Sequence, residues 1–292
     1  MPKVLAFRIL CSKQQIQGLL TKEVQGRDLH ILVSTFCHNL WEVRDIEEFK
    51  RVFLDCLECK CRSFSHCFPP PHCYLHTGHY HAYHTGHILH RDISENNLMI
   101  FRAEPSADAV GILNDFDMAV ERLPEVKETQ VNAAHHRTGT LPFMALELLD
   151  NHETEPVHLY RHDLESFFYI LIWGATHYDF ESQTRRSTPN LMKDWLNPKT
   201  APDMKFRLLN GPYFQSAITP LKLKPFDELW QKWVVPLRVV FGRAFHERTY
   251  GSSEANFDNI TINGQVTFEK FMAAIGETPQ GLNPKSVIEV AK

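Results

Sequence analysis

The stretch HILHRDISENNLMI, residues 87–100, places a carboxylate, Asp92, five residues before an amide, Asn97. This short step allows one loop to direct both side chains into the same cleft. Transfer of a phosphoryl group requires an oriented hydroxyl and neutralisation of the developing charge, with little covalent help from the protein. Asp92 suits the first task, because a carboxylate can accept the proton of a hydroxyl. The stretch therefore predicts the centre of a phosphotransferase.

Three further stretches follow in the chain and extend the same chemistry. They are NDFDMA with Asp115, GTLPFMALELL from Gly139, and YRHDLESFFY with Asp163 at the head of an apolar run. Mg²⁺ is a hard ion that prefers oxygen ligands. The amide of Asn97 and the carboxylate of Asp115 offer such ligands, so the sequence predicts a Mg²⁺ site at these two residues.

Together the four stretches resemble the protein-kinase signature set of catalytic loop, metal-binding triplet and activation-segment end. In detail they resemble the fungal-type protein kinase family, through HRDIS.NN, DFD, RTGTLPFMA.ELL and YRHDLESFFY. The similarity covers roughly residues 29–273, apart from residues 60–78. It implies an α+β, protein-kinase-like fold, with a mostly α-helical large lobe and a reduced N-terminal β remnant. Four motifs in the right order are more specific than any single one.

The resemblance also implies roles for individual residues. Asp92 would be the catalytic base, and Asn97 and Asp115 would hold the Mg²⁺ that accompanies ATP. Thr140 would contact Asp92 from the substrate side. These four residues form the predicted catalytic set, and Asn97 and Asp115 are also the predicted cofactor-binding and metal-binding residues.

Four neighbouring residues are implied to be structural. His90 and Arg91 would support the catalytic loop, and Arg91 would face a phosphorylated or acidic activation segment. Glu147 would anchor the activation segment through an arginine that the sequence does not identify. Asp163 would brace the backbone of the catalytic loop from the buried helix.

The chain departs from the common protein-kinase pattern in three respects. Ser94 stands where many protein kinases have a lysine, and Asp117 replaces the glycine of the metal-binding triplet, although the fungal-type family shares both features. Upstream of Asp92 there is no Gly-x-Gly-x-x-Gly motif and no VAIK-like strand that offers a lysine to the phosphates. Two functions are therefore weighed: ATP-dependent phosphorylation of protein Ser/Thr hydroxyls, and a catalytically inactive, pseudokinase-like module that binds a protein partner.

The predicted domain organisation has three parts. Residues 1–44 are a small-lobe remnant and hinge, residues 45–275 are the kinase-like large lobe, and residues 276–292 are a C-terminal tail. Within the remnant, residues 29–34 read as a β-strand, because LHILVS is short, apolar and β-rich.

The large lobe is predicted to begin with a helix in DIEEFKRVFLDCLEC. Asp45 is its cap and Glu48 the partner in a capping box. Residues 60–78 cannot continue the helix, because they contain three consecutive prolines. When these residues are removed, Tyr80 and Tyr83 fall on the apolar face of the helix. We therefore interpret residues 60–78 as an insert, and hypothesise that it is translated intron sequence.

Four later elements are predicted from apolar patterns and turn residues. A strand is expected within residues 110–120, a buried helix within residues 159–178, and a helix within residues 226–245 that is interrupted or kinked at Pro236. DNITINGQVTFE, residues 258–269, is interpreted as a hairpin with an Asn-Gly turn rather than a calcium loop.

Composition restricts the class of protein. The formal net charge of −4 argues against a dedicated nucleic-acid binder, and no apolar run is long enough to span a membrane. The seven cysteines are irregularly spaced, which favours a reducing cytoplasm or nucleus over a secreted disulfide framework. The alternative for the His/Cys-rich insert is a zinc site; we prefer a disordered loop.

Overall fold

The computed structural model describes residues 4–11, 29–34, 36–58, 78–121, 139–150, 156–251 and 256–279. These residues form helices and small antiparallel sheets, which is compatible with the predicted α+β class. The helices are α2 (Ile46–Glu58), α3 (His79–His84), α4 (Leu146–Leu149), α5 (Tyr160–His177), α6 (Ala201–Asn210), α7 (Asp227–Leu229), α8 (Val235–Gly251) and α9 (Phe268–Ala274).

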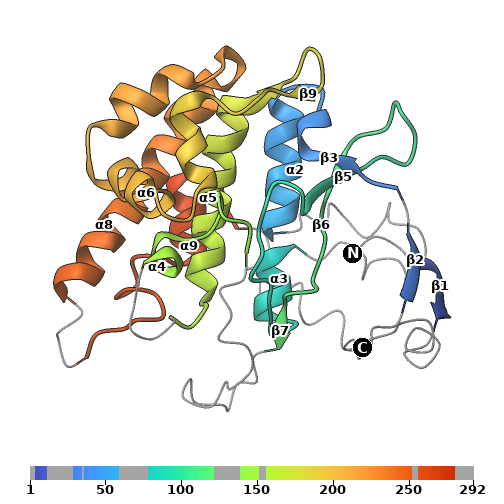
Figure 1. Cartoon of the computed structure of the whole chain (residues 1–292), viewed down its shortest axis with the longest axis horizontal. Helices are drawn as coiled ribbons and strands as arrows, with labels where there is room; N and C mark the ends of the chain where they lie inside the picture. The colour runs from blue at the N-terminus through green and yellow to red at the C-terminus, as the bar shows by residue number, and fades with distance from the viewer. Residues whose placement is uncertain are drawn as a thin grey trace, which may run out of the picture.

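The strands are short and pair antiparallel. They are β1 (Val4–Cys11), β2 (Leu29–Ser34), β3 (His38–Asn39), β4 (Ile88–Leu89), β5 (Leu98–Phe101), β6 (Val110–Leu113), β7 (Val120–Glu121), β8 (Tyr178–Asp179) and β9 (Thr184–Arg185). The predicted strand at residues 29–34 is confirmed as β2, which pairs with β1. Figure 1 shows α4, α5, α6, α8 and α9 gathered on one side of α2, and β3, β5 and β6 on the other.

Helix α2 starts at the predicted cap. The backbone N–H of Glu48 donates to Oδ1 of Asp45 at 2.8 Å, which satisfies one of the free donors at the helix start. The carboxylate of Glu48 accepts from the backbone N–H of Arg44 at 2.7 Å, one residue earlier than in a capping box. Phe49 and Phe53 are completely buried, as the apolar face of the helix predicts.

Helix α3 continues the apolar face of α2. Tyr80 is buried and Tyr83 packs against the same hydrophobic core, as predicted from the register without residues 60–78. The two helices contact each other, and α3 lies just beyond the end of α2 in Figure 1. The structure describes Gly78, which caps α3, but residues 59–77 lie outside the described residues. The insert hypothesis remains a prediction.

A three-stranded sheet in the order β3-β5-β6 packs on α2. Gly111 in β6 allows this close approach, because a Cβ there would lie 2.2 Å from the carbonyl oxygen of Val52. The backbone N–H of Gly111 also donates to Oδ2 of Asp55 at 3.1 Å. The sheet is therefore held at a fixed distance from α2. The pairing of β3 with β5 also joins residues 38–39 to the large helical body.

Helix α5 is the centre of the core and confirms the buried helix predicted within residues 159–178. All of its residues are buried, because helices surround it. Its Phe167 ring lies 5.5 Å from the ring of Phe53 in α2, and its Phe168 ring lies 5.2 Å from that of Phe241 in α8. These aromatic contacts join the first and last parts of the lobe.

The predicted helix at residues 226–245 is present, is irregular before Pro236, and is longer than expected. A π-helical turn, Trp230–Val234, precedes α8, and α8 continues to Gly251. Pro236 is the second residue of α8, a position where its missing N–H is tolerated.

The hairpin predicted within residues 258–269 is wrong. The described backbone there forms successive turns that lead into α9. Asp258 and Asn263 bond to each other: Asp258 N–H donates to Oδ1 of Asn263 at 2.9 Å, and Asn263 N–H donates to the Asp258 carbonyl at 3.0 Å. Asn263 and Gly264 have the positive φ of an Asn-Gly turn, but Ile262 also has φ 54° and is buried in the core. Side-chain bonding and burial therefore replace strand pairing.

Several predictions fall outside the described residues. They concern the cysteines and histidines of residues 59–77 and the tail after residue 279. Within the described parts of the chain, no helix is both long and apolar enough to cross a membrane. No cluster of three or more His, Cys, Asp or Glu side chains suited to a metal ion occurs among those same residues.

Candidate active site

The pairing of β5 with β6 brings the two predicted magnesium ligands into one region. Leu98, at the start of β5, is opposite Leu113, at the end of β6. Asn97 precedes the first strand and Asp115 follows the second, so both come to the same end of the pair. The backbone N–H of Asn114 donates to the carbonyl of Asn97 at 2.8 Å, which fixes this arrangement.

Asp92 is held by residues from two distant segments. The backbone N–H and the hydroxyl of Thr140 both donate to Oδ1 of Asp92, at 2.8 and 2.9 Å. Nδ2 of Asn97 donates to the carbonyl oxygen of Asp92 at 2.8 Å and lies 3.5 Å from its Oδ2. The structure therefore brings Asp92, Asn97 and Thr140 together. Oδ2 of Asp92 is left as the weakly bonded oxygen that can receive a proton.

The donor set around Asn97 and Asp115 fits Mg²⁺. Because Nδ2 of Asn97 is committed to the carbonyl of Asp92, its Oδ1 is left as an oxygen ligand. The carboxylate of Asp115 is exposed, and among the described residues it has one weak bond, from the backbone N–H of Asp117 to its Oδ1 at 3.4 Å. An amide oxygen and a carboxylate are ligands that Mg²⁺ accepts in ATP-binding sites.

His90 connects the catalytic loop to the segment before Asp115. Its Nδ1 accepts the backbone N–H of Asp92 at 3.3 Å, so its Nε2 carries the proton and donates to the carbonyl of Asn114 at 2.9 Å. Burial lowers the pKa of His90 and so favours this neutral form. The ring is therefore a spacer of fixed tautomer between Asp92 and Asp115.

Asp163 supports the loop from the start of α5. Its Oδ2 accepts the backbone N–H of Arg91 at 3.3 Å and the ring of His79 at 2.9 Å, and its Oδ1 bonds His158 at 2.7 Å. Burial alone would raise the pKa of Asp163, but the two histidines outweigh it and hold that pKa well below its ordinary value. Arg91 has φ 70°, a strained conformation that the bond to Asp163 helps to retain.

The sequence did not identify two of these partners. His79 lies in α3, just ahead of the stretch that holds Asp92, and His158 lies just before α5; neither belongs to a motif that the sequence shows. His79 is completely buried, and its ring stacks on Tyr160 at 4.6 Å. His79 comes soon after residues 59–77 in the sequence, and its hydrogen bond to Asp163 of α5 could not be predicted from that position.

Glu147 forms ion pairs with two arginines, Arg161 and Arg248. The sequence predicted an arginine partner for Glu147 but did not identify it. Its Oε2 lies 2.5 Å from Arg161 and 3.1 Å from Nε2 of His162, and its Oε1 lies 3.6 Å from Arg248. Burial would raise the pKa of Glu147, but the hydrogen bond of His162 and the charge of Arg161 hold it well below its usual range. This cluster joins α4 to α5 and α8.

The two departures from the common kinase pattern lie in different surroundings. Ser94 is buried, and because a serine hydroxyl is neutral this position supplies no cation. Asp117 is exposed, at the turn that follows Asp115. Residues 122–138, between Asp115 and Thr140, are outside the described part of the chain, and Arg91 itself is buried.

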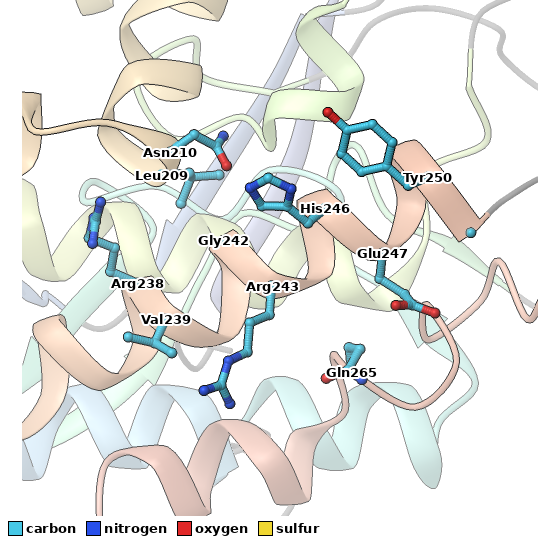
Figure 2. A pocket seen from close by; sticks show the side chains of 11 residues that line it. Leu209, Asn210, Arg238, Val239, Gly242, Arg243, His246, Glu247, Tyr250 and Gln265 are labelled. Atoms are coloured by element: carbon cyan, nitrogen blue, oxygen red, sulfur yellow. The ribbon is translucent and has the colours of Figure 1, made fainter.

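A separate open groove of about 720 Å³ runs along α8. Figure 2 shows Arg238, Arg243 and His246 along that helix, with Leu209 and Asn210 from the end of α6 beside it. Arg238 is already committed, since it donates to the carbonyls of Leu208 and Gly211. None of the predicted catalytic residues lines this groove.

Comparison with known proteins bears on the segment that contains the catalytic loop. No curated protein matches the chain. Residues 76–175 match the family described as fungal protein kinase. This segment includes Asp92, Asn97, Asp115, Thr140 and Asp163. The comparison therefore confirms, for residues 76–175, the fungal protein kinase family that the four motifs indicate.

Proposed function

We propose that the protein has a protein-kinase-like fold and transfers a phosphoryl group from ATP to Ser/Thr hydroxyls of a protein substrate. The observation that carries the proposal is the convergence on Asp92. Thr140 holds one oxygen of its carboxylate and Asn97 holds its backbone carbonyl, although the three residues come from two segments. Such a carboxylate is suited to orient a hydroxyl and receive its proton.

Asn97 and Asp115 are the residues that would hold Mg²⁺, and the ion would neutralise charge on the phosphates of ATP. Other residues of the site would position Asp92 and Asp115 for the reaction. His90 keeps the loop of Asp92 at a fixed distance from the segment of Asp115. Asp163 holds the backbone of Arg91, and with it the loop, against α5.

A protein substrate is consistent with the loop that follows Thr140. Thr140, at the start of this loop, bonds Asp92, and the loop leads directly into α4, whose Glu147 is tied to α5. A firmly anchored loop beside a catalytic carboxylate can receive an extended peptide.

The alternative function is a pseudokinase-like module that binds a protein partner without turnover. Ser94 favours it, because a neutral serine supplies no cation at the position where many kinases have a phosphate-binding lysine. The two functions differ in whether phosphate leaves ATP.

The experiment combines ATP binding with phosphate transfer. We expect Mg²⁺-ATP to raise the unfolding temperature of the purified full-length chain, and Asp115→Asn to reduce this shift. We also expect radiolabelled phosphate to appear in casein or in arrayed Ser/Thr peptides. A thermal shift without transfer would support the pseudokinase function. Neither a shift nor transfer would contradict the kinase function.

A further inference from the structure

Lys205 is an unusual residue because its side chain is completely buried. It lies in α6 and is 0% exposed. An isolated ammonium group is strongly destabilising in an apolar interior unless other groups replace its water. The groups that contact Lys205 therefore indicate the role of its positive charge.

The ammonium group of Lys205 bonds the loop that follows Thr140. It donates to the carbonyl oxygens of Leu141, at 3.3 Å, and Met144. Its Nζ also lies 4.1 Å from the centre of the Tyr169 ring and 5.9 Å from that of Trp195. Two aromatic faces thus stabilise the cation from α5 and from the 3-10 helix Asn190–Leu196.

Glu165 in α5 bonds the other end of the same loop. Its Oε1 accepts the backbone N–H of Leu146 at 2.9 Å and the hydroxyl of Tyr169 at 2.6 Å. Lys205 therefore donates to two carbonyl oxygens of the loop, and Glu165 accepts a backbone N–H at the end of the loop. Burial lowers the pKa of Lys205 and raises that of Glu165, while the charge of each partner opposes the shift of the other.

This loop transmits its position to Asp92. Thr140 precedes Leu141 directly and donates two hydrogen bonds to Asp92. Its carbonyl accepts the N–H of Phe143 at 2.8 Å, which closes a turn between the two carbonyls that Lys205 holds. A shift of Leu141 and Met144 would therefore move Thr140 away from Asp92.

We propose that Lys205 is a positioning residue: from α6 it fixes residues 140–144, and thereby sets the geometry of Thr140 at Asp92 and of the surface that receives a protein substrate. This inference rests on the proposed function for its catalytic consequence. The ordering of residues 140–144 by Lys205 does not depend on phosphate transfer.

The first test is hydrogen exchange in the full-length chain, wild type against Lys205→Met. Methionine keeps the apolar stem and removes the donor, so the carbonyls of Leu141 and Met144 lose their partner. We expect exchange at the amides of residues 140–146 to become about 10- to 100-fold faster, the range for loss of a charge-assisted hydrogen bond. Exchange within α5 should remain slow. Lys199→Met, an exposed lysine near α6, is the matched control and should leave exchange unchanged.

A second variant covers the case in which Lys205→Met does not fold. Removing the cation leaves the carboxylate of Glu165 buried without its charge partner, which is destabilising. The double variant Lys205→Met/Glu165→Gln neutralises both, while Gln retains an oxygen for Leu146 N–H. We expect it to fold and to show the same fast exchange at residues 140–146. Slow exchange there, in either folded variant, would overturn the proposal.

The catalytic arm separates positioning from general stability. In Lys205→Met, kcat/KM for a casein or peptide substrate should fall about 10- to 100-fold, while KM for ATP stays at the wild-type value. A raised KM for ATP, or unchanged kinetics, would overturn the positioning role. A wild-type chain that transfers no phosphate would overturn the proposed function instead, and the exchange measurement would then decide the role of Lys205.

Discussion

At the scale of single residues, the site combines strained backbone with fixed hydrogen bonds. Arg91 and Asp115 have φ of 70° and 60°, values that non-glycine residues rarely adopt. Arg91 precedes Asp92 and Asp115 follows Asn114, and the ring of His90 bonds the backbone of both Asp92 and Asn114. Strain of this kind persists where surrounding contacts determine the conformation, and it is frequent at functional sites.

Thr140 offers a test of how Asp92 is oriented. Thr140→Val removes the hydroxyl bond to Oδ1 of Asp92 and keeps the backbone N–H bond. We expect kcat of phosphate transfer to fall about 10-fold, since a hydrogen bond to a charged group contributes about 1.5 kcal/mol or more. Thr140→Ser, which keeps the hydroxyl, should retain most of the activity. Equal rates for the two variants would contradict the orienting role.

His177 predicts part of the pH dependence of stability. Burial lowers its pKa to about 4, whereas an exposed histidine has a pKa of about 6.5. Between these values the unfolded chain binds a proton that the folded protein does not bind. The free energy of unfolding should therefore decrease as the pH falls from about 6.5 to about 4, by up to about 3 kcal/mol from this group.

His177→Phe isolates that contribution. Phenylalanine keeps the stacking on Trp173, whose ring centre lies 3.9 Å away, and removes the titration. Urea unfolding between pH 4.5 and 7.5 should show a smaller loss of stability on acidification than in the wild type. His246→Phe, at an exposed position, should keep the wild-type dependence. Parallel pH dependences for all three proteins would argue against this role of His177.

At the scale of elements, sequence patterns identified the helices and strands that have a strong local signal. Asp45 marks the start of α2 because its carboxylate caps the helix, and the apolar run of α5 marks a buried helix. Helix α6 was missed because it is short and charged residues interrupt its apolar ones. One of these charged residues, Lys205, is completely buried, and only the packing of α5 and α6 explains that.

The cap of α2 can be measured directly. Asp45→Ala removes the acceptor for the N–H of Glu48, and we expect the free energy of unfolding to decrease by about 1 kcal/mol. Asp45→Asn should remain within a few tenths of a kcal/mol of the wild type, because asparagine caps equally well. Urea unfolding of the two variants gives both values. A loss in Asp45→Asn as large as in Asp45→Ala would mean that charge, not capping, matters there.

At the scale of the whole molecule, a few buried charges connect elements that are distant in the sequence. Arg161 in α5 bonds Glu147 in α4, and its Nε donates to the carbonyl of Asn259 at 3.0 Å. The motifs predicted that Glu147 and Asp163 would be structural anchors. Their partners could not be predicted, because each lies on a different element and only the tertiary fold brings them together.

The two arginines of Glu147 should differ in their contribution to stability. Arg161 is 4% exposed and Arg248 is 19% exposed, and the distances to Glu147 are 2.5 and 3.6 Å. Arg161→Met leaves a buried carboxylate poorly compensated, so we expect a loss of about 3 kcal/mol. Arg248→Met should lose about 1 kcal/mol or less. The ranking is checked by urea unfolding at pH 7, and a larger loss for Arg248→Met would contradict it.

The most direct test of the central claim is the initial rate of Mg²⁺-dependent phosphate transfer from ATP in the wild type and in Asp92→Asn. Asparagine preserves the size of the side chain but cannot act as a base. We predict a rate at least about 100-fold lower, with an unchanged unfolding temperature. Asp108→Asn, at an exposed position, should retain the wild-type rate. Equal rates for the wild type and Asp92→Asn would contradict the assignment of Asp92 as the catalytic base.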